Sequence, residues 1–336
     1  MRLLGARDLF LLLVMALVKA ASWLPSSTMR EGLITAMGRG AYYFDRSTRL
    51  QAERNLSKAF DGKLSEDEVH RIVKEAMREY WVETFSLLPS RTERHELQEV
   101  QVQGIEHLRR ALENGKGVIL WESAFGRRML PKQVLNHMGF ALHQIHAEYH
   151  FAEFFGGYGP LTWVQRHILR PFFDSCEKEF IAEIIYLPGS DSLAFTRLLL
   201  RRLRQNAILV SAADGWSGQK LIPLEFLGQM DLFATGMVSL ARMSGAPILP
   251  MFCVQERGHA ARLNIEPPID IQPEASREQA LENALSQYIR LLESYVRKHP
   301  EKYRRWHFVG KSRDWVVNLR RVHHTKRGGS SDRRFG

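Results

Sequence analysis

The feature that most constrains the fold is a repeated alternation of short apolar runs and helix-like segments between residues 104 and 265. Apolar runs of strand length occur at 118–121, near 140–147, and at Glu183–Leu187, Ala207–Ala213, Pro247–Val254 and Arg262–Ile265. Helix-like segments separate them at Ile105–Glu113, at about 127–138 and 160–181, after Ser190-Asp191, and at 234–244. Because parallel strands are usually joined by a helix, this order predicts an α/β fold with a mostly parallel central sheet flanked by helices.

The residues before about 100 have a different, helical pattern. Ser65-Glu66-Asp67-Glu68 forms a capping box, with a serine three residues before a glutamate. Apolar residues then recur at spacings of three and four from Val69 to Phe85, which indicates an amphipathic helix. We therefore expect an N-terminal helical region ahead of the sheet.

The first segment of the chain is strongly apolar. Leu9 to Val18 is uninterrupted by polar residues and is preceded by Arg2 and Arg7, but it is shorter than the roughly 20 residues that span a bilayer. Val18-Lys19-Ala20 makes a poor signal-peptide cleavage site. Residues 1–26 are therefore expected to form a membrane-anchoring or interfacial helix, with a signal peptide and a buried soluble helix as the alternatives. Residues 27–310 are expected to form a single domain, and 311–336 a basic, flexible tail.

The charge of the chain favours anionic partners. The formal net charge is +10 and the isoelectric point is near 9.7. An anionic membrane surface, an acidic protein or a nucleic acid could satisfy this charge. No nucleic-acid recognition module is present, so we expect no nucleic-acid partner. Two cysteines with no metal-site spacing give no reason to expect a metal.

Polar residues collect where two of the expected strands end. Glu122-Ser123 follows the strand 118–121, and Asp214-Gly215 follows the strand 207–213. Ligands bind outside the carboxyl ends of the strands in open parallel sheets, so these two exits should face each other across a site. Glu122 and Asp214 are the candidate catalytic residues.

Glu122 is expected to act as a base, because burial at a strand end should raise its pKa. The alternative is that Glu122 forms a buried ion pair with Arg127 or Arg128.

The candidate substrate-binding residues are chosen for their positions around these strand exits. The two arginines Arg127 and Arg128 are suited to a phosphate or a carboxylate. Ser123 could also cap the following helix, and His146 lies on a neighbouring expected strand.

A series of short blocks resembles the late acyltransferases of lipid A biosynthesis, within the wider lysophospholipid acyltransferase family. These blocks occur in the family's order over most of residues 1 to 310. They include Arg54-Asn55-Leu56, Gly104-Ile105-Glu106-His107-Leu108, Gly115-Lys116-Gly117, Phe125-Gly126, Asp214-Gly215, Phe226-Leu227-Gly228, Ala234-Thr235-Gly236, Gly245-Ala246-Pro247 and His299-Pro300-Glu301. Gly228, within one block, is a further candidate substrate-binding residue.

The resemblance implies a membrane-associated enzyme on the cytoplasmic face of the inner membrane of a bacterial-type cell. It would move a fatty acyl chain from a co-substrate, acyl-ACP (acyl carrier protein) or acyl-CoA, to a lipid or glycolipid, with no bound cofactor. Its partners would be membrane lipid and an acyl carrier protein, while the oligomeric state is left open.

The residues on which the family's chemistry depends are absent. The family uses a histidine followed, after four residues, by an acid, in which the histidine deprotonates the acceptor hydroxyl. Alignment on Phe125-Gly126 places Ala124 and Met129 at these two positions. The same spacing also occurs in His70–Glu75 and His143–Glu148, but two such pairs are close to the number that chance predicts for this composition. An alternative function therefore stays open: a catalytically inactive acyltransferase-fold protein that binds lipid or a partner.

Overall fold

The computed structural model describes residues 6–24, 26–88, 97–147, 161–187, 192–215, 220–256, 258–272 and 276–311. Its helices are α1 (Ala6–Ala21), α2 (Ser27–Phe44), α3 (Arg46–Ala59), α4 (Glu66–Phe85), α6 (Ile105–Glu113), α7 (Met129–His137), α9 (Arg170–Glu177), α10 (Ser192–Arg204), α11 (Gly236–Ser244) and α12 (Arg277–Lys298). The π-helical turn η1 (Gln165–Leu169) leads into α9, and the 3-10 turns η2 (Pro300–Lys302) and η3 (Trp306–Phe308) follow α12.

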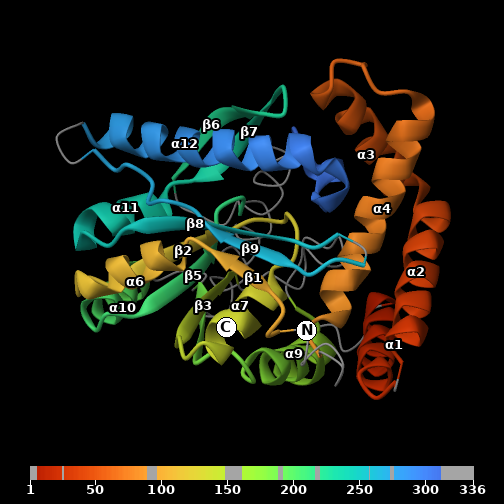
Figure 1. The fold of residues 1–336 in the computed structure, drawn as a ribbon, viewed down its shortest axis with the longest axis horizontal. Coiled ribbons are helices and arrows are strands. Elements are labelled where there is room, and N and C mark those ends of the chain that lie inside the picture. The colour runs from red at the N-terminus through yellow and green to blue at the C-terminus, as the bar shows by residue number, and fades with distance from the viewer. Residues whose placement is uncertain are drawn as a thin grey trace, which may run out of the picture.

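The strands are β1 (Gln101–Gln103), β2 (Val118–Glu122), β3 (Leu142–Ala147), β4 (Glu183–Leu187), β5 (Ile208–Ala212), β6 (Leu221–Phe226), β7 (Gln229–Ala234), β8 (Ile248–Val254) and β9 (Arg262–Ile265). Seven of them form one sheet in the order β1-β9-β8-β2-β5-β3-β4. Its neighbouring strands are parallel except for β8 and β9. The predicted α/β fold with a mostly parallel central sheet flanked by helices is therefore confirmed (Figure 1).

Side chains from alternate positions of the strands build a core on each face of the sheet. On one face, Ile119 and Trp121 of β2 pack in a cluster with residues of α10, α11 and α12. On the other face, Val118 and Leu120 pack with residues of α6, α7 and α9. β2 is buried along its whole length because both faces are covered, which explains its continuous apolar sequence.

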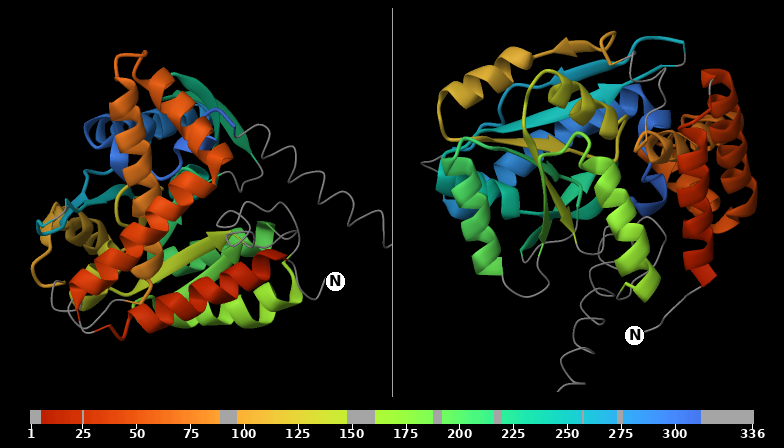
Figure 2. Two further views of the ribbon diagram at one scale, coloured as in Figure 1. Left: turned by 90° about the vertical axis from the view of Figure 1, so that its right-hand side faces the viewer. Right: turned by 90° about the horizontal axis from the view of Figure 1, so that it is seen from below.

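The N-terminal helices form a layer beside the sheet (Figures 1 and 2). The predicted capping box at the start of α4 is confirmed, with the Ser65 and Glu68 side chains each bonded to the other's backbone. α3 and α4 contact the end of the described chain, α4 through Glu79, which accepts from the ammonium of Lys302 at 2.9 Å. The Asn55 amide donates to the carbonyls of Trp306 at 2.7 Å and Val309 at 3.0 Å. These contacts bring residues 300–311 back against the N-terminal layer.

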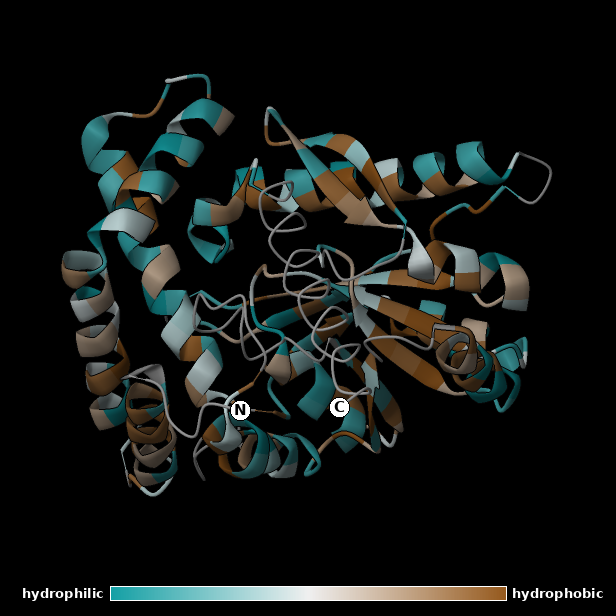
Figure 3. Ribbon diagram, turned by 180° about the vertical axis from the view of Figure 1, so that it is seen from behind, coloured by the Kyte–Doolittle hydropathy of each residue, from teal (hydrophilic) through white to brown (hydrophobic). Residues whose placement is uncertain are grey.

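α1 buries one face against its neighbours and leaves apolar side chains on the other. Leu11, Val14 and Val18 are buried, whereas Leu9 and Leu13 are 60% and 56% exposed. Figure 3 shows how apolar this helix is. Within the described residues, the structure contains no helix with both the length and the apolar character needed to cross a bilayer.

Several elements differ from the sequence prediction. β9 runs antiparallel to β8 because the short connection 255–261 holds no crossover helix in its described residues. The β6–β7 hairpin, β1 and α12 were not predicted. The expected cap at Ser190-Asp191 and the tail from 312 onward lie outside the described residues.

Candidate active site

The exits of β2 and β5 lie together, as the sequence predicted. The two strands pair in parallel, with Glu122 opposite Ala212. Just beyond them, the backbone N–H of Ala124 donates to Oδ2 of Asp214 at 2.8 Å. Asp214 is buried, with 6% of its surface exposed. Asp214 therefore holds the β2 exit turn in place through a main-chain bond.

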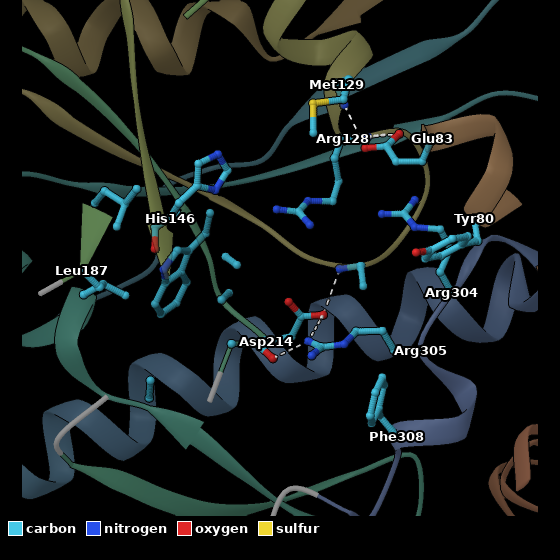
Figure 4. A pocket seen from close by; sticks show the side chains of 18 of the residues that line it. Tyr80, Glu83, Arg128, Met129, His146, Leu187, Asp214, Arg304, Arg305 and Phe308 are labelled. Carbon is cyan, nitrogen blue, oxygen red and sulfur yellow. Dashed lines mark hydrogen bonds and ion pairs between the residues drawn. The ribbon is translucent and has the colours of Figure 1, made fainter. Parts of the chain in front are cut away.

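A cavity of about 1490 Å³ lies over this edge of the sheet. Its apolar wall includes Phe10 of α1, Met37 and Phe44 of α2, and Trp81 of α4. Its polar lining residues include Glu83, Arg128, His146, Glu177, Asp214, Arg304 and Arg305, most of which are shown in Figure 4. Ala124 and Met129 also line it. The cavity thus combines a long apolar wall with a polar end at the strand exits.

Glu122 is held in a buried ion pair. Its Oε1 accepts from Arg128 at 2.6 Å, and the ammonium of Lys132 lies 3.3 Å away. Burial alone would raise the pKa of Glu122, but Arg128 and Lys132 outweigh it and lower this pKa to about 2. The predicted rise in pKa is therefore wrong, because two cations contact the carboxylate. The alternative of an ion pair with Arg128 is confirmed.

The turn after β2 is fixed mainly through its backbone. Gly126 has a φ of 58°, and a Cβ there would lie 2.0 Å from the carbonyl oxygen of Cys253. Glu83, from α4, accepts from the backbone N–H groups of Arg128 and Met129 at 3.0 and 3.1 Å. Because the first N–H groups of a helix need external acceptors, Glu83 acts as the cap of α7 that was expected from Ser123. The Ser123 side chain is buried, and α7 receives no side-chain cap from it.

The two arginines of the turn have different surroundings. The guanidinium of Arg127 donates to the side chains of Gln255 and Ser86 and is not among the groups lining the cavity. Arg128 lines the cavity while holding Glu122. Of the two predicted anion-binding arginines, the structure brings only Arg128 to the site.

Two further arginines reach the cavity from the end of the chain. The backbone N–H of Arg304 donates to the carbonyl of Ala124 at 3.0 Å, and its guanidinium donates to the carbonyl of Gly126. Arg305 donates to the carbonyl of Asp214 at 2.9 Å, and its guanidinium lies 3.7 Å from the Asp214 carboxylate. The sequence analysis identified neither as a site residue. Their position three and four residues after the block His299-Pro300-Glu301 was the available signal.

His146 is paired with a carboxylate on the cavity wall. Its Nε2 lies 2.7 Å from Oε2 of Glu177, which comes from α9, and both side chains are buried. His146 was a predicted site residue, but Glu177 was not, because no local pattern connects residues 31 positions apart. His143, which precedes it on β3, instead pairs with Glu183 at 2.8 Å and does not line the cavity.

Gly228 lies in the turn of the β6–β7 hairpin. Leu227 and Gly228 have φ values of 52° and 72°, as in the two-residue turns that suit the twist of a hairpin. Gly228 is not among the residues lining the cavity. Its role in the structure is that of a turn residue.

Comparison with known families agrees with this geometry. The chain matches the family described as bacterial lipid A biosynthesis acyltransferase over residues 2–145 and 185–308, which is most of its length. The matched segments include the N-terminal helices, the strand exits of β2 and β5, and Arg304 and Arg305. No curated protein matches the chain closely enough to count as a relative.

Proposed function

The chain belongs to the bacterial lipid A biosynthesis acyltransferase family, and from this premise we propose that it transfers a fatty acyl chain from an acyl thioester to a lipid or glycolipid acceptor. Membership of the family supports an acyltransferase. The thioester donor is acyl-ACP or acyl-CoA. The acceptor differs from the family's usual one, since Ala124 and Met129 stand at the dyad positions.

The observation that carries this proposal is the cavity. At about 1490 Å³ it exceeds the roughly 300–1,000 Å³ typical of a site for one small ligand. Its apolar wall suits acyl chains, and its polar end suits a headgroup and a thioester. A site for two lipid-like substrates has this combination of size and polarity.

We assign the base to His146 rather than to Glu122. A carboxylate with a pKa of about 2 is a weak base near neutral pH. His146 is paired with Glu177 at 2.7 Å, and a buried carboxylate of this kind stabilises the imidazolium that forms when a histidine accepts a proton.

In the proposed step, the imidazole takes the acceptor's hydroxyl proton as the oxygen attacks the thioester carbonyl carbon. The carbon–sulfur bond then breaks, and the imidazolium returns the proton to the leaving thiolate. Asp214 contributes by holding the turn at Ala124.

The protein is further proposed to act at the cytoplasmic face of the inner membrane. Leu9, Phe10 and Leu13 on α1 and the nearby Trp23 are exposed apolar side chains. A helix that lies in the membrane interface buries such a face among the lipids, and a net charge of +10 favours an anionic surface. Lipid acceptors would reach the cavity from this side because Phe10 also lines it.

One specific observation favours a second candidate, a lipid-binding protein without catalytic activity. Neither Ala124 nor Met129 can transfer a proton, and both side chains line the cavity.

An assay of acyl transfer tests both candidate functions. Purified protein is incubated with labelled acyl-ACP or acyl-CoA and a membrane lipid extract. His146→Gln should reduce transfer by about 10²- to 10⁴-fold. His143→Gln is the control, because His143 also pairs with a carboxylate on the same strand but lies outside the cavity. Transfer that survives His146→Gln would remove His146 as the base. Tight lipid binding with no transfer to any acceptor would establish the second candidate instead.

A further inference from the structure

One hydrogen-bond donor on the cavity wall has no acceptor in the described chain. Trp121 lines the cavity and is 1% exposed, and its indole N–H has no hydrogen-bond partner among the described residues. An indole nitrogen can only donate, and a buried tryptophan usually has an acceptor for it. A buried donor without an acceptor costs free energy, and an acceptor atom on a bound ligand would recover that cost.

The indole ring is held rigidly. Trp121 lies on β2, the middle strand of the sheet, and its ring packs edge-to-face against that of Tyr288 from α12, with centroids 4.9 Å apart. Tyr288 is itself fully buried. Because the indole cannot turn without repacking this pair, the direction of its N–H is fixed before a ligand binds. A donor fixed in advance stabilises developing charge without having to reorient.

The neighbouring strand leaves room for a ligand beside the ring. Trp121 pairs with Ser211 in the parallel register of β2 and β5, so both side chains leave the same face of the sheet. Ser211 and the four residues that follow it all line the cavity. Three of those four, Ala212, Ala213 and Gly215, are as small as Ser211 or smaller. A ligand can therefore approach the indole over the end of β5.

The surroundings of the ring select a neutral acceptor. Ile145, Leu199 and Leu240 line the cavity and belong to the same apolar cluster as Trp121. A carboxylate or a phosphate placed among these side chains would lose its hydration without gaining a cation. A carbonyl oxygen loses much less and needs only one donor. The thioester of the acyl donor carries such an oxygen, next to an acyl chain that suits these apolar side chains.

Trp121 and His146 reach this edge of the sheet from opposite faces. Trp121 packs in the cluster that contains residues of α10, α11 and α12, whereas His146 pairs with Glu177 of α9. β5 lies between their strands, so the two backbones are about 10 Å apart. Both residues line the cavity. A thioester lying over the edge of the sheet can therefore have the acceptor hydroxyl at His146 on one side and the indole N–H on the other.

We propose that the indole N–H of Trp121 donates to the carbonyl oxygen of the acyl thioester and to the oxyanion that this oxygen becomes during transfer. This inference rests on the proposed function and adds a catalytic residue to it. As the acceptor's oxygen adds to the carbonyl carbon, the electrons of the carbonyl π bond move onto its oxygen, where the N–H stabilises the charge. When the carbonyl re-forms, the carbon–sulfur bond breaks and the thiolate takes the proton held by His146.

The first experiment observes the indole N–H directly, so that it does not depend on acyl transfer. ¹H–¹⁵N NMR spectra of the full-length protein show the tryptophan indole signals, and Trp121→Phe identifies the Trp121 signal by its loss. The titrants are acyl-CoA and acyl-ACP, the alkyl thioether of each, which lacks the carbonyl, and diacylglycerol in neutral detergent micelles. Trp163→Phe is the matched control, since Trp163 is 40% exposed and is not among the residues lining the cavity.

An acyl donor that binds should move the Trp121 indole proton signal downfield, because a hydrogen bond to a carbonyl deshields the proton, whereas its thioether should not. The Trp163 signal should stay in place with both. If Trp121→Phe fails to fold, the wild-type spectra still decide, because one of the seven tryptophans must respond to the thioester and not to the thioether.

The second experiment measures acyl transfer by the folded variant. Trp121→Phe should lower kcat by about 10²- to 10³-fold, the usual effect of removing one donor to an oxyanion. KM should change little, because the phenyl ring keeps most of the packing and the hydrogen bond is strongest in the transition state. Trp163→Phe should leave both constants unchanged.

Four outcomes would overturn the proposal. They are a Trp121 signal that no acyl donor moves, an equal movement with the thioether, a downfield shift with diacylglycerol instead of the donors, and an unchanged kcat in Trp121→Phe. The third would assign the N–H to an ester carbonyl of the acceptor lipid. A shift that requires the thioester, without transfer to any acceptor, would contradict the proposed function and leave this carbonyl site standing.

Discussion

Replacing Glu122 by glutamine should destabilise the fold by about 3 kcal/mol. Glu122 is 1% exposed and contacts both Arg128 at 2.6 Å and Lys132 at 3.3 Å. These cations lower its pKa from an ordinary 4.5 to about 2. At about 1.36 kcal/mol for each pH unit, the difference corresponds to about 3 kcal/mol. This agrees with the roughly 3–5 kcal/mol lost when one partner of a buried pair is removed.

The effect has a defined pH dependence. As the pH falls below 4.5, Glu122 takes up a proton in the unfolded chain, whereas in the folded chain it stays deprotonated until about pH 2. The stabilisation is therefore fully present above pH 4.5 and is lost between 4.5 and about 2. The variant lacks this carboxylate. The difference in the free energy of unfolding between wild type and variant should therefore become smaller between pH 4.5 and about 2.

Urea unfolding followed by tryptophan fluorescence, at several pH values from about 7 down to about 3, measures this deficit. Glu278→Gln is the matched control, since Glu278 contacts Lys220 at 3.0 Å but its side chain is 82% exposed. Its unfolding midpoint should stay close to that of wild type. Two results would refute the reasoning. One is a loss of unfolding free energy in Glu122→Gln no larger than that in the control, and the other is a loss that stays constant as the pH falls.

Three further predictions follow from the site and its supports. His146→Gln should reduce acyl transfer by about 10²- to 10⁴-fold, the usual contribution of a general base, in variant protein that urea unfolding shows to be folded, because the substitution also removes the buried pair with Glu177. Gly126→Ala should cost more than about 2 kcal/mol in urea unfolding, because φ is 58° and the new Cβ would meet the carbonyl of Cys253 at 2.0 Å, whereas Gly228→Ala, with φ of 72° and open space, should cost only about 1–2 kcal/mol. An equal loss of unfolding free energy for the two substitutions would contradict the destabilising role of the contact with the Cys253 carbonyl. Asn55→Ala should lower the free energy of unfolding by about 2–4 kcal/mol, because two buried carbonyls lose their donor; a smaller loss would show that water replaces it.

The elements that the sequence predicted correctly are those coded by local pattern. Glu183–Leu187 and Arg262–Ile265 were found with their observed bounds, and the capping box at Ser65 was recognised from four residues. Each of these signals depends on neighbouring residues alone. α12 has a similar signal in the buried residues Leu281, Leu285 and Leu292, and could have been predicted from it.

Other features depend on contacts between distant residues. The antiparallel direction of β9 follows from the lack of a helix in its connection, and no property of its own four residues indicates it. The pair His146–Glu177 and the position of Arg304 near the β2 exit require α9 and the end of the chain to fold back on the sheet. Such pairings are set by topology, which a single sequence does not display.

Glu122 shows most clearly which properties follow from the sequence and which depend on the tertiary structure. The sequence by itself determined that this residue ends a buried strand, whereas the placement of Ala124 and Met129 at the family's dyad positions stays a prediction from the resemblance. Only the tertiary structure decided the charge state of Glu122, because the sign of a pKa shift depends on which charges lie within a few ångströms. It placed Arg128 and Lys132 against Glu122, and Arg304 across from Arg128. The turn after β2 is therefore a strongly charged structure built by segments that lie far apart in the chain.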